Sequence, residues 1–235
     1  MPNVTISEMK RAIIIMAKAP VAGAVKTRLA PFLSPAECAE LAAAFLRDTF
    51  AKAKTVCENT ILAYSPRAQR AVLESILQTE TIYLEQTGAD LGERMSNAFE
   101  FAFAGNSDAV VMIGTDSPTF PAEYLERAFE CLERASDIVL GATTDGGFYL
   151  IGLRKNYPEL FENVRWSSAQ VFKQTMENAE RLKLRAAQIS AWYDVDVPDD
   201  LARLRKEILS ADKIEAPATY QWLSANSELF GSGND

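Results

Sequence analysis

Three aspartates stand where their carboxylates could bind a divalent metal ion. Asp116 follows a buried apolar run in "MIGTDSP", and Asp194 and Asp196 lie two residues apart in "DVDVPDD". Residues two apart in an extended segment face the same way, so this last pair would repel unless a cation lay between them. Together the three would make a hard oxygen site suited to Mg²⁺ or Mn²⁺. The alternatives are a helix cap at Asp116 and a solvated acidic turn at the other two.

The stretch "MAKAPVAGAVKTRLAP" indicates a phosphate-binding loop after a buried strand. It holds three cations, Lys18, Lys26 and Arg28, among small residues that would let a ligand approach the backbone. It is not a Walker A motif, because Val25 precedes the lysine and Pro20 stands in place of the upstream glycine. The alternative is a solvated basic loop.

The stretch "TTDGGFYLIG" places Asp145 before two glycines and a predicted strand. Gly146 and Gly147 could form a hairpin turn, since Asp-Gly is a common turn pair. They could equally let a ligand lie against the backbone.

Two further stretches carry weaker signals. In "EQTGADLGERM", Arg94 could reach a ligand or pair with Glu93 or Asp90. In "RWSS", Trp166 is typical of a core or pocket wall, and Ser167 is expected to cap a helix.

The amino-acid composition excludes several classes of catalytic and metal site. The 235 residues contain no histidine, which excludes Ser-His-Asp triads, Cys-His dyads and histidine-bound zinc. A formal net charge of -8 disfavours a nucleic-acid partner.

Three widely spaced cysteines indicate a reducing compartment, and the polar start "MPNVTISEMKR" indicates neither a signal peptide nor a membrane span. We therefore expect a cytoplasmic protein.

The elements that must position these residues alternate between strand and helix. Such alternation predicts a mostly parallel sheet with helices on both faces, and ligands beyond the carboxyl ends of the strands. We expect a single domain over residues 1–235, with a core at about 11–210 and a C-terminal helix and tail at 211–235. The predicted strands are 11–17, 59–65, 81–86, 108–115, 137–143 and 147–153, the helices are 34–54, 68–77, 91–104, 121–135, 168–182 and 200–209, and 189–200 is expected to be mostly irregular.

The order of these motifs resembles a known family. "APVAGAVKTRL", "GTDSP", "TTDGGFYLIGL", "RWSS" and "DVDVPDDL" occur in the order seen in the DUF2064 proteins, also called the selenodomain-associated transferase 1 group. These are similar to the nucleotide-diphospho-sugar transferase superfamily, and the guanylyltransferases that build molybdenum cofactor and coenzyme F420 are relatives. The resemblance spans about residues 11–205 and implies a three-layer α/β/α sandwich of the GT-A type.

The resemblance also implies residue roles. Lys26 and Arg28 match cations that bind the nucleotide phosphates. Asp116 matches the carboxylate that holds the metal, although a literal DxD motif is absent because the residues on either side are Thr115 and Ser117. Asp194 and Asp196 match the closing metal ligands, and water and phosphate oxygens would complete the coordination because the chain has no histidine.

The expected site follows from both arguments. We expect catalytic roles for Asp145 and Lys26, nucleotide binding by Ala17, Lys18, Pro20, Gly23, Lys26, Arg28, Arg94 and Asp116, acceptor contacts from Gly146, Gly147, Trp166 and Ser167, and metal binding by Asp116, Asp194 and Asp196.

These expectations favour a metal-dependent transferase with a nucleotide-diphosphate donor and a small-molecule acceptor. A glycosyltransferase using a nucleotide-sugar is the first interpretation. A nucleotidyltransferase that releases pyrophosphate and a non-catalytic nucleotide-binding module are the alternatives. The apolar stretch "TYQWLSANSELF" could pack on its own domain or on a partner, so a homodimer stays open.

Overall fold

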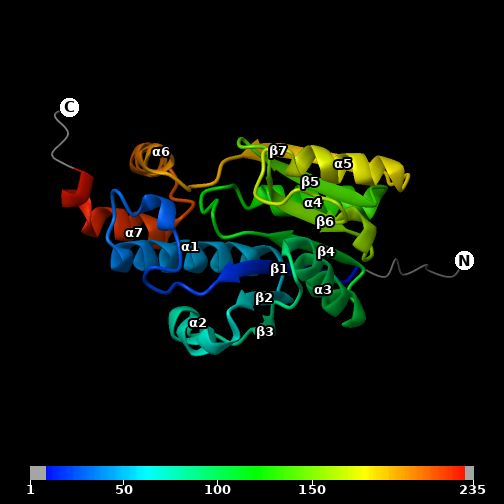
Figure 1. The fold of residues 1–235 in the computed structure, drawn as a ribbon, viewed down its shortest axis with the longest axis horizontal. Helices are drawn as coiled ribbons and strands as arrows, with labels where there is room; N and C mark the ends of the chain where they lie inside the picture. The colour runs from blue at the N-terminus through cyan, green and yellow to red at the C-terminus, as the bar shows by residue number, and fades with distance from the viewer. Residues whose placement is uncertain (1–8, 231–235) are drawn as a thin grey trace, which may run out of the picture.

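A seven-stranded sheet runs through the centre of the molecule (Figure 1). The computed structural model describes residues 9–230; most of the polar start of the chain and the tail "GSGND", for which we expect fraying, lie outside this range. The strands are β1 (Arg11–Lys18), β2 (Thr60–Ser65), β3 (Ile82–Glu85), β4 (Ala109–Ile113), β5 (Ile138–Thr143), β6 (Phe148–Leu153) and β7 (Ala186–Trp192). Their order is β3-β2-β1-β4-β6-β5-β7, and only β6 runs antiparallel to its neighbours. The expected mostly parallel sheet is confirmed.

The central strands are apolar along their whole length because both faces of the sheet are covered. In β1 the side chains from Ala12 to Ile15 are all fully buried, and they alternate between two separate hydrophobic clusters. Ile13 pairs with Val111 of β4 in register, so the two most apolar strands lie side by side. Parallel strands buried on both faces have this continuous apolar pattern.

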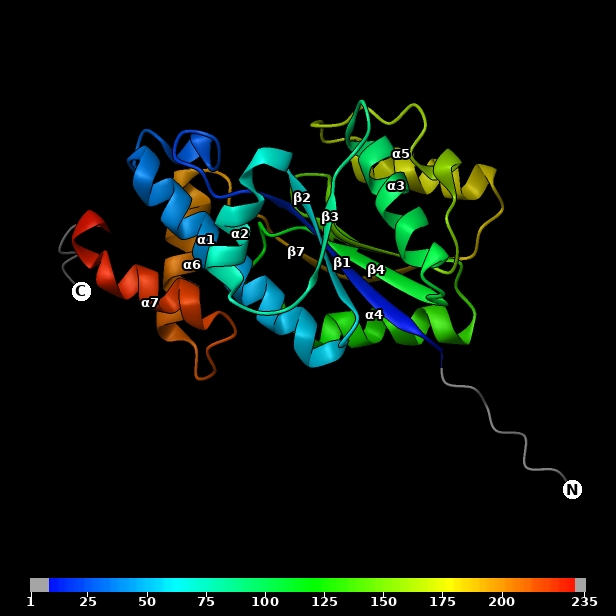
Figure 2. The ribbon, with the colours of Figure 1, turned by 90° about the horizontal axis from the view of Figure 1, so that it is seen from below.

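Helices cover both faces of the sheet (Figure 2). The cluster on one face involves α1 (Pro35–Val56), α2 (Arg70–Leu77) and α4 (Glu123–Arg134). The other cluster involves α3 (Leu91–Ala104) and α5 (Val171–Arg181). This arrangement is the three-layer α/β/α sandwich that the sequence predicts.

The start of α1 is fixed by a reciprocal cap between Ser34 and Glu37. Ser34 accepts a hydrogen bond from the backbone N–H of Glu37 at 3.3 Å, and its own N–H donates to the Glu37 carboxylate at 2.6 Å. Pro35 occupies the first helical position, where a missing N–H costs nothing. This cap ends the loop that follows β1 and so sets the geometry of that loop.

A third cluster packs α6 (Pro198–Ser210) and α7 (Pro217–Ala225) against α1 (Figure 1). Asp48 in α1 is buried and accepts hydrogen bonds from the backbone N–H groups of Ala218 and Thr219, both at 2.8 Å. The apolar C-terminal stretch therefore packs on its own chain. The same cluster contains Tyr193 and Val195, so these helices also support the segment after β7.

The prediction of an irregular segment at residues 189–200 is wrong in its first part. β7 extends to Trp192 and pairs in parallel with β5 at the edge of the sheet. Its residues "AAQISAW" carry few large apolar side chains and it has only one neighbouring strand, so the apolar alternation is weak. The rest of the segment, from Tyr193 to Val197, is indeed irregular.

All three cysteines are free thiols. Within residues 9–230, no helix is both long enough and apolar enough to cross a bilayer.

Candidate active site

A cavity of about 480 Å³ lies at the carboxyl ends of β1 and β4. Its polar wall comes from the loop after β1, the loop after β4 and the segment after β7. The predicted residues that line it are Ala17, Lys18, Lys26, Arg28, Asp116, Asp194 and Asp196. Segments far apart in the chain thus meet at the sheet edge where doubly wound folds bind ligands.

Asp116 is held at this edge by the backbone of the segment after β7. β4 ends at Ile113, and the Asp116 carbonyl accepts a hydrogen bond from the N–H of Val195 at 2.9 Å. Its side chain is 50% exposed and lines the cavity. α4 begins only at Glu123, so Asp116 does not cap that helix. The cap interpretation of Asp116 is therefore wrong.

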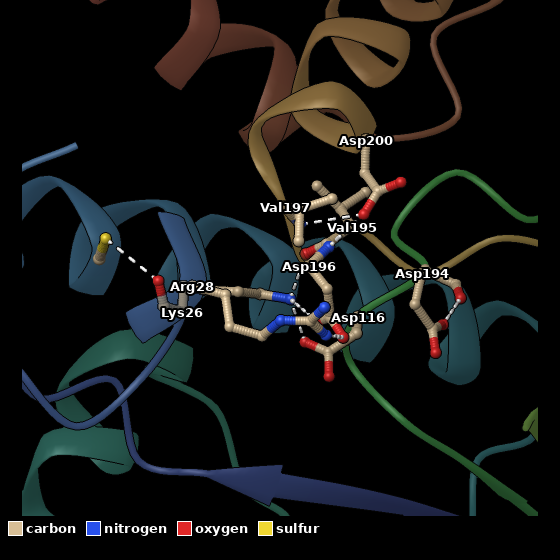
Figure 3. Close-up of polar contacts among 10 residues, drawn as sticks. Lys26, Arg28, Asp116, Asp194, Val195, Asp196, Val197 and Asp200 are labelled. Atoms are coloured by element: carbon tan, nitrogen blue, oxygen red, sulfur yellow. Dashed lines mark hydrogen bonds and ion pairs between the residues drawn. The ribbon is translucent and has the colours of Figure 1, made fainter. Parts of the chain in front are cut away.

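The ammonium group of Lys26 is buried among the carboxylates (Figure 3). It forms an ion pair with Asp116, donates a hydrogen bond to the Val195 carbonyl at 2.7 Å and lies 3.7 Å from the Asp196 carboxylate. The ring centroid of Phe45 is 5.2 Å away. Because the Lys26 side chain is only 6% exposed, these groups, and not water, balance its charge.

Asp194 is the most buried carboxylate of the cluster. Burial, and to a lesser extent the charges of Asp116, Asp145 and Asp196, raise its pKa to about 7, although a hydrogen bond from the Ser117 hydroxyl opposes the rise. Burial also raises the pKa of Asp196, while nearby cations oppose that shift. The cluster is therefore short of positive charge at neutral pH.

The loop after β1 supplies the remaining cations. Arg28 donates to the Asp196 carboxylate at 3.2 Å, although its side chain is 68% exposed. Lys18 ends β1, is exposed and has no ion pair within residues 9–230. A merely solvated basic loop would not bury Lys26 as this one does.

The "TTDGG" stretch forms the hairpin turn between β5 and β6. The Asp145 carboxylate accepts hydrogen bonds from the Thr143 hydroxyl and from the N–H of Gly147. Gly146 has φ of +94°, and a Cβ there would lie 2.3 Å from the Ala169 carbonyl oxygen, so only glycine fits. None of the three predicted residues lines the cavity, but Asp145 is near enough to affect the cluster electrostatically.

Arg94 does not make the ion pairs considered for it. Asp90 caps α3 by accepting from the N–H of Glu93, and the Glu93 carboxylate accepts from the N–H of Ala89. The guanidinium of Arg94 instead donates to the Gly88 carbonyl at 3.2 Å. It is half-buried and does not line the cavity.

Two residues of the phosphate loop also lie outside the cavity wall. Pro20 is buried behind the loop. Gly23 forms an exposed turn with φ of +78°, and a Cβ there would meet no atom within 4 Å. Both belong to the loop that carries Lys26 but do not line the cavity.

Trp166 belongs to the core, as its aromatic type suggests. It packs beside Phe161, and a Cβ on Gly92 would lie 2.8 Å from its ring. Its indole N–H is buried without a hydrogen-bond partner. This position makes Trp166 a wall behind α3 and not a surface for stacking.

The expected helix cap at Ser167 is wrong. Ser167 is exposed with φ of +62°, and α5 begins only at Val171 after Gln170, which has no side-chain cap. The hydroxyl of Ser168 accepts from the N–H of Gln170 at 3.3 Å. The left-handed turn at Ser167 delays the start of the helix by three residues.

The cavity has an apolar wall that sequence reasoning missed. It comes from Met16, Met95, Met112, Phe148 and Ile151. All five lie in segments that read as buried core, and nothing in such a pattern marks which core positions face an open end. Ser117 was also missed as a partner of Asp194, although it stands within the motif that carries Asp116.

The expected metal site can be compared with this geometry. Within the described residues, no three acidic, histidine or cysteine side chains are arranged to hold a metal ion as they stand. The Lys26 ammonium lies instead between Asp116 and Asp196 as a stand-in cation. Hard oxygen donors around a buried positive charge suit Mg²⁺ or Mn²⁺ in kind.

The sequence model of one family, described as uncharacterized proteins conserved in bacteria (DUF2064), matches residues 43–168, which is more than half of the chain. The chain belongs to the DUF2064 family. None of the curated proteins compared with it is significantly similar.

Solved structures share the fold of this DUF2064 protein. A crystal structure from Desulfovibrio desulfuricans G20, provisionally named a nucleotide-diphospho-sugar transferase, has 31% identity and a TM-score of 0.87, with 94% of this chain and 97% of that chain covered. A cytidylyltransferase from Leptospira borgpetersenii has 15% identity, a TM-score of 0.55 and coverages of 97% and 99%. The inositol-1-phosphate CTP transferase of T. maritima has 17% identity, a TM-score of 0.53 and coverages of 92% and 96%. The fold is therefore that of the nucleotide-diphospho-sugar transferases.

Proposed function

We propose that this DUF2064 protein is a metal-dependent transferase that binds a nucleotide-diphosphate donor, and specifically a glycosyltransferase that uses a nucleotide-sugar. One observation carries the proposal: the cationic loop after β1 and the aspartates after β4 and β7 meet in a single cavity. The name of the Desulfovibrio desulfuricans structure supports the same class of donor.

Lys26, Arg28 and Lys18 would bind the diphosphate. They are the cations of the cavity, and an overall acidic protein needs such a local cluster to attract an anionic donor. In a partly buried site their charge acts more strongly on a diphosphate than it would in water. These side chains would orient the donor and stabilise charge on the leaving nucleotide.

Asp116, Asp194 and Asp196 would hold Mg²⁺ or Mn²⁺, with water and phosphate oxygens completing the coordination. A metal bound here would neutralise the negative charge that develops on the leaving diphosphate.

Asp145 would accept the proton of the acceptor hydroxyl. Its charge acts on Asp194 and Asp196, so its carboxylate lies close to the proposed metal ligands. The hairpin fixes it through Thr143 and Gly147, and a positioned carboxylate can act as a general base.

Product analysis tests the reaction class. The protein would be incubated with Mn²⁺, a panel of nucleotide-sugars and nucleoside triphosphates, and candidate acceptor alcohols and phosphates. Release of a nucleoside diphosphate from a nucleotide-sugar is the expected result. Pyrophosphate release would identify a nucleotidyltransferase instead, and binding without turnover across the panel would favour a non-catalytic module.

Asp116→Asn tests the site itself. We expect it to weaken Mn²⁺-dependent nucleotide binding by at least about tenfold, because it removes a carboxylate from the cation cluster. Isothermal titration calorimetry with and without Mn²⁺ measures this, and Asp212→Asn, an exposed acidic residue outside the cavity, is the matched control. Unchanged affinity in Asp116→Asn would remove this residue from the proposed site.

A further inference from the structure

Lys26 holds an unusual position for a phosphate-binding lysine. Its ammonium does not extend into the open cavity but turns to Asp116, the Val195 carbonyl and Asp196. All three are groups of the proposed cation site, and two of them are proposed metal ligands. The Lys26 ammonium, which the diphosphate would need, is therefore already paired with Asp116 and Asp196, which the metal would need.

The backbone of Lys26 is anchored, and its buried ammonium is held by the groups of the cluster and lies beside the Phe45 ring. Its carbonyl accepts hydrogen bonds from the N–H of Leu29 at 2.8 Å and from the thiol of Cys38 at 3.5 Å. The long, flexible lysine side chain carries a compact charge with rotatable donors. Exchange of partners at the ammonium thus requires rotation about side-chain bonds alone.

The charges of the cluster also argue for exchange. Lys26 and Arg28 pair with Asp116 and Asp196, and Asp194 is a third carboxylate of the same cluster, so three acidic side chains share two cations. A divalent cation added alone would turn this shortage into an excess of positive charges beside a buried ammonium. A nucleoside diphosphate brought in together with the metal would supply negative charge to balance them and give the lysine a new partner.

We propose that Lys26 is an exchangeable counter-ion: in the free protein its ammonium neutralises the carboxylates, and it moves to the diphosphate when a divalent metal takes its place. This inference rests on the proposed function and deepens it. Metal and nucleotide would then bind cooperatively, and metal alone would bind weakly because it competes with an internal cation. The coupling is reciprocal, so each ligand raises the affinity for the other by the same factor.

Direct metal titration of the nucleotide-free protein tests this without any measurement of activity. Mn²⁺ binding would be followed by electron paramagnetic resonance for the wild type, Lys26→Met and Lys18→Met. Lys18 is the matched control because it lines the same cavity and its loss changes the net charge equally, yet it has no ion pair within residues 9–230. We expect Lys26→Met to bind Mn²⁺ at least about tenfold more tightly than the wild type, and Lys18→Met to change by less than about threefold.

The same titrations give the outcomes that overturn the inference. If Lys26→Met binds free Mn²⁺ no more tightly than Lys18→Met, while nucleotide and Mn²⁺ still bind together to the wild type, the exchange is wrong and the proposed function stands. If no protein binds Mn²⁺ even with nucleoside diphosphate present, both are wrong. Lys26→Arg keeps the charge and should not tighten Mn²⁺ binding; tightening there would also contradict the exchange. Lys26→Gln replaces Lys26→Met if thermal unfolding shows the latter is misfolded.

Discussion

Asp145 shows how one side chain can be tied to both structure and chemistry. It stabilises the β5–β6 hairpin by accepting from Thr143 and Gly147, and its charge also reaches the aspartates of the cavity. A hairpin role alone needs an oxygen acceptor, whereas a proton-accepting role needs a carboxylate. The two roles therefore separate in the amide variant.

We expect Asp145→Asn to lower kcat by about 10²- to 10⁴-fold while the dissociation constant of the donor changes by less than about threefold. The amide keeps an oxygen for the two hydrogen bonds of the turn but cannot take up a proton. Steady-state kinetics and calorimetry measure the two quantities, and thermal unfolding checks the hairpin. An unchanged kcat would restrict Asp145 to the turn.

Residue types in the sequence predicted the members of the charged cluster but not their pairing. Asp116, Asp194 and Asp196 were placed in one site because each follows a strand or lies in an extended segment. That Lys26 lies between two of them depends on contacts across 90 and 170 residues, which no local pattern carries. The prediction of a helix cap at Ser167 failed for a local reason: the left-handed backbone there overrides the usual capping preference of serine.

At the scale of elements, α6 begins beside the site without a capping side chain at its N-cap. Val197 occupies the N-cap position with φ of -123° and ψ of 165°, but its side chain has no acceptor. Asp200 compensates in part, because its carboxylate accepts from the N–H groups of Asp196 and Val197. The N–H of Asp200 has no side-chain oxygen at the N-cap to which it can donate a hydrogen bond.

Val197→Thr should stabilise the protein by about 0.5–1 kcal/mol, because the hydroxyl can cap the first turn of α6 without a change of backbone. Urea unfolding measures the difference in the free energy of unfolding. Val197→Ala is the control, since it shortens the side chain without adding an acceptor and should not stabilise. Equal stability of the threonine variant and the wild type would contradict this account of the cap.

Elements with strong periodic patterns were predictable, but the edge strand β7 was not. α3 was predicted with its observed bounds, because its amphipathic pattern marks its length. β7 was missed because an edge strand packs few large side chains, and its existence is decided by pairing with β5. The antiparallel placement of β6 between β4 and β5 likewise depends on the whole sheet.

For the whole molecule, the acidic groups act on stability in two directions. The hydrogen bonds and charge of Arg185 lower the pKa of Asp137 to about 2, and the pair ties the start of β5 to the start of β7. Asp137 therefore contributes stability above its ordinary pKa near 4, and this is lost as the pH falls through 2. Asp194, with its pKa raised to about 7, does the reverse: it costs stability as the pH rises between about 4 and 7.

We expect Asp137→Asn to lower the free energy of unfolding by about 1 kcal/mol at pH 7, less than the full pKa shift implies because solvent screens the exposed arginine. The difference from the wild type should shrink between pH 4 and pH 2. Urea unfolding at several pH values measures it, with Asp212→Asn as the control. A difference that stays constant down to pH 2 would show that the ion pair is not its cause.

The backbone hydrogen bond from Val195 to Asp116, and the contact of the Lys26 ammonium with the Val195 carbonyl, have a consequence for biosynthesis. A ribosome makes the cationic loop first and the closing aspartates some 170 residues later. Until that late segment has emerged and docked, the nascent polypeptide holds an incomplete pocket. Ligand capture should therefore be one of the last events of its maturation, unable to guide the early collapse of the sheet.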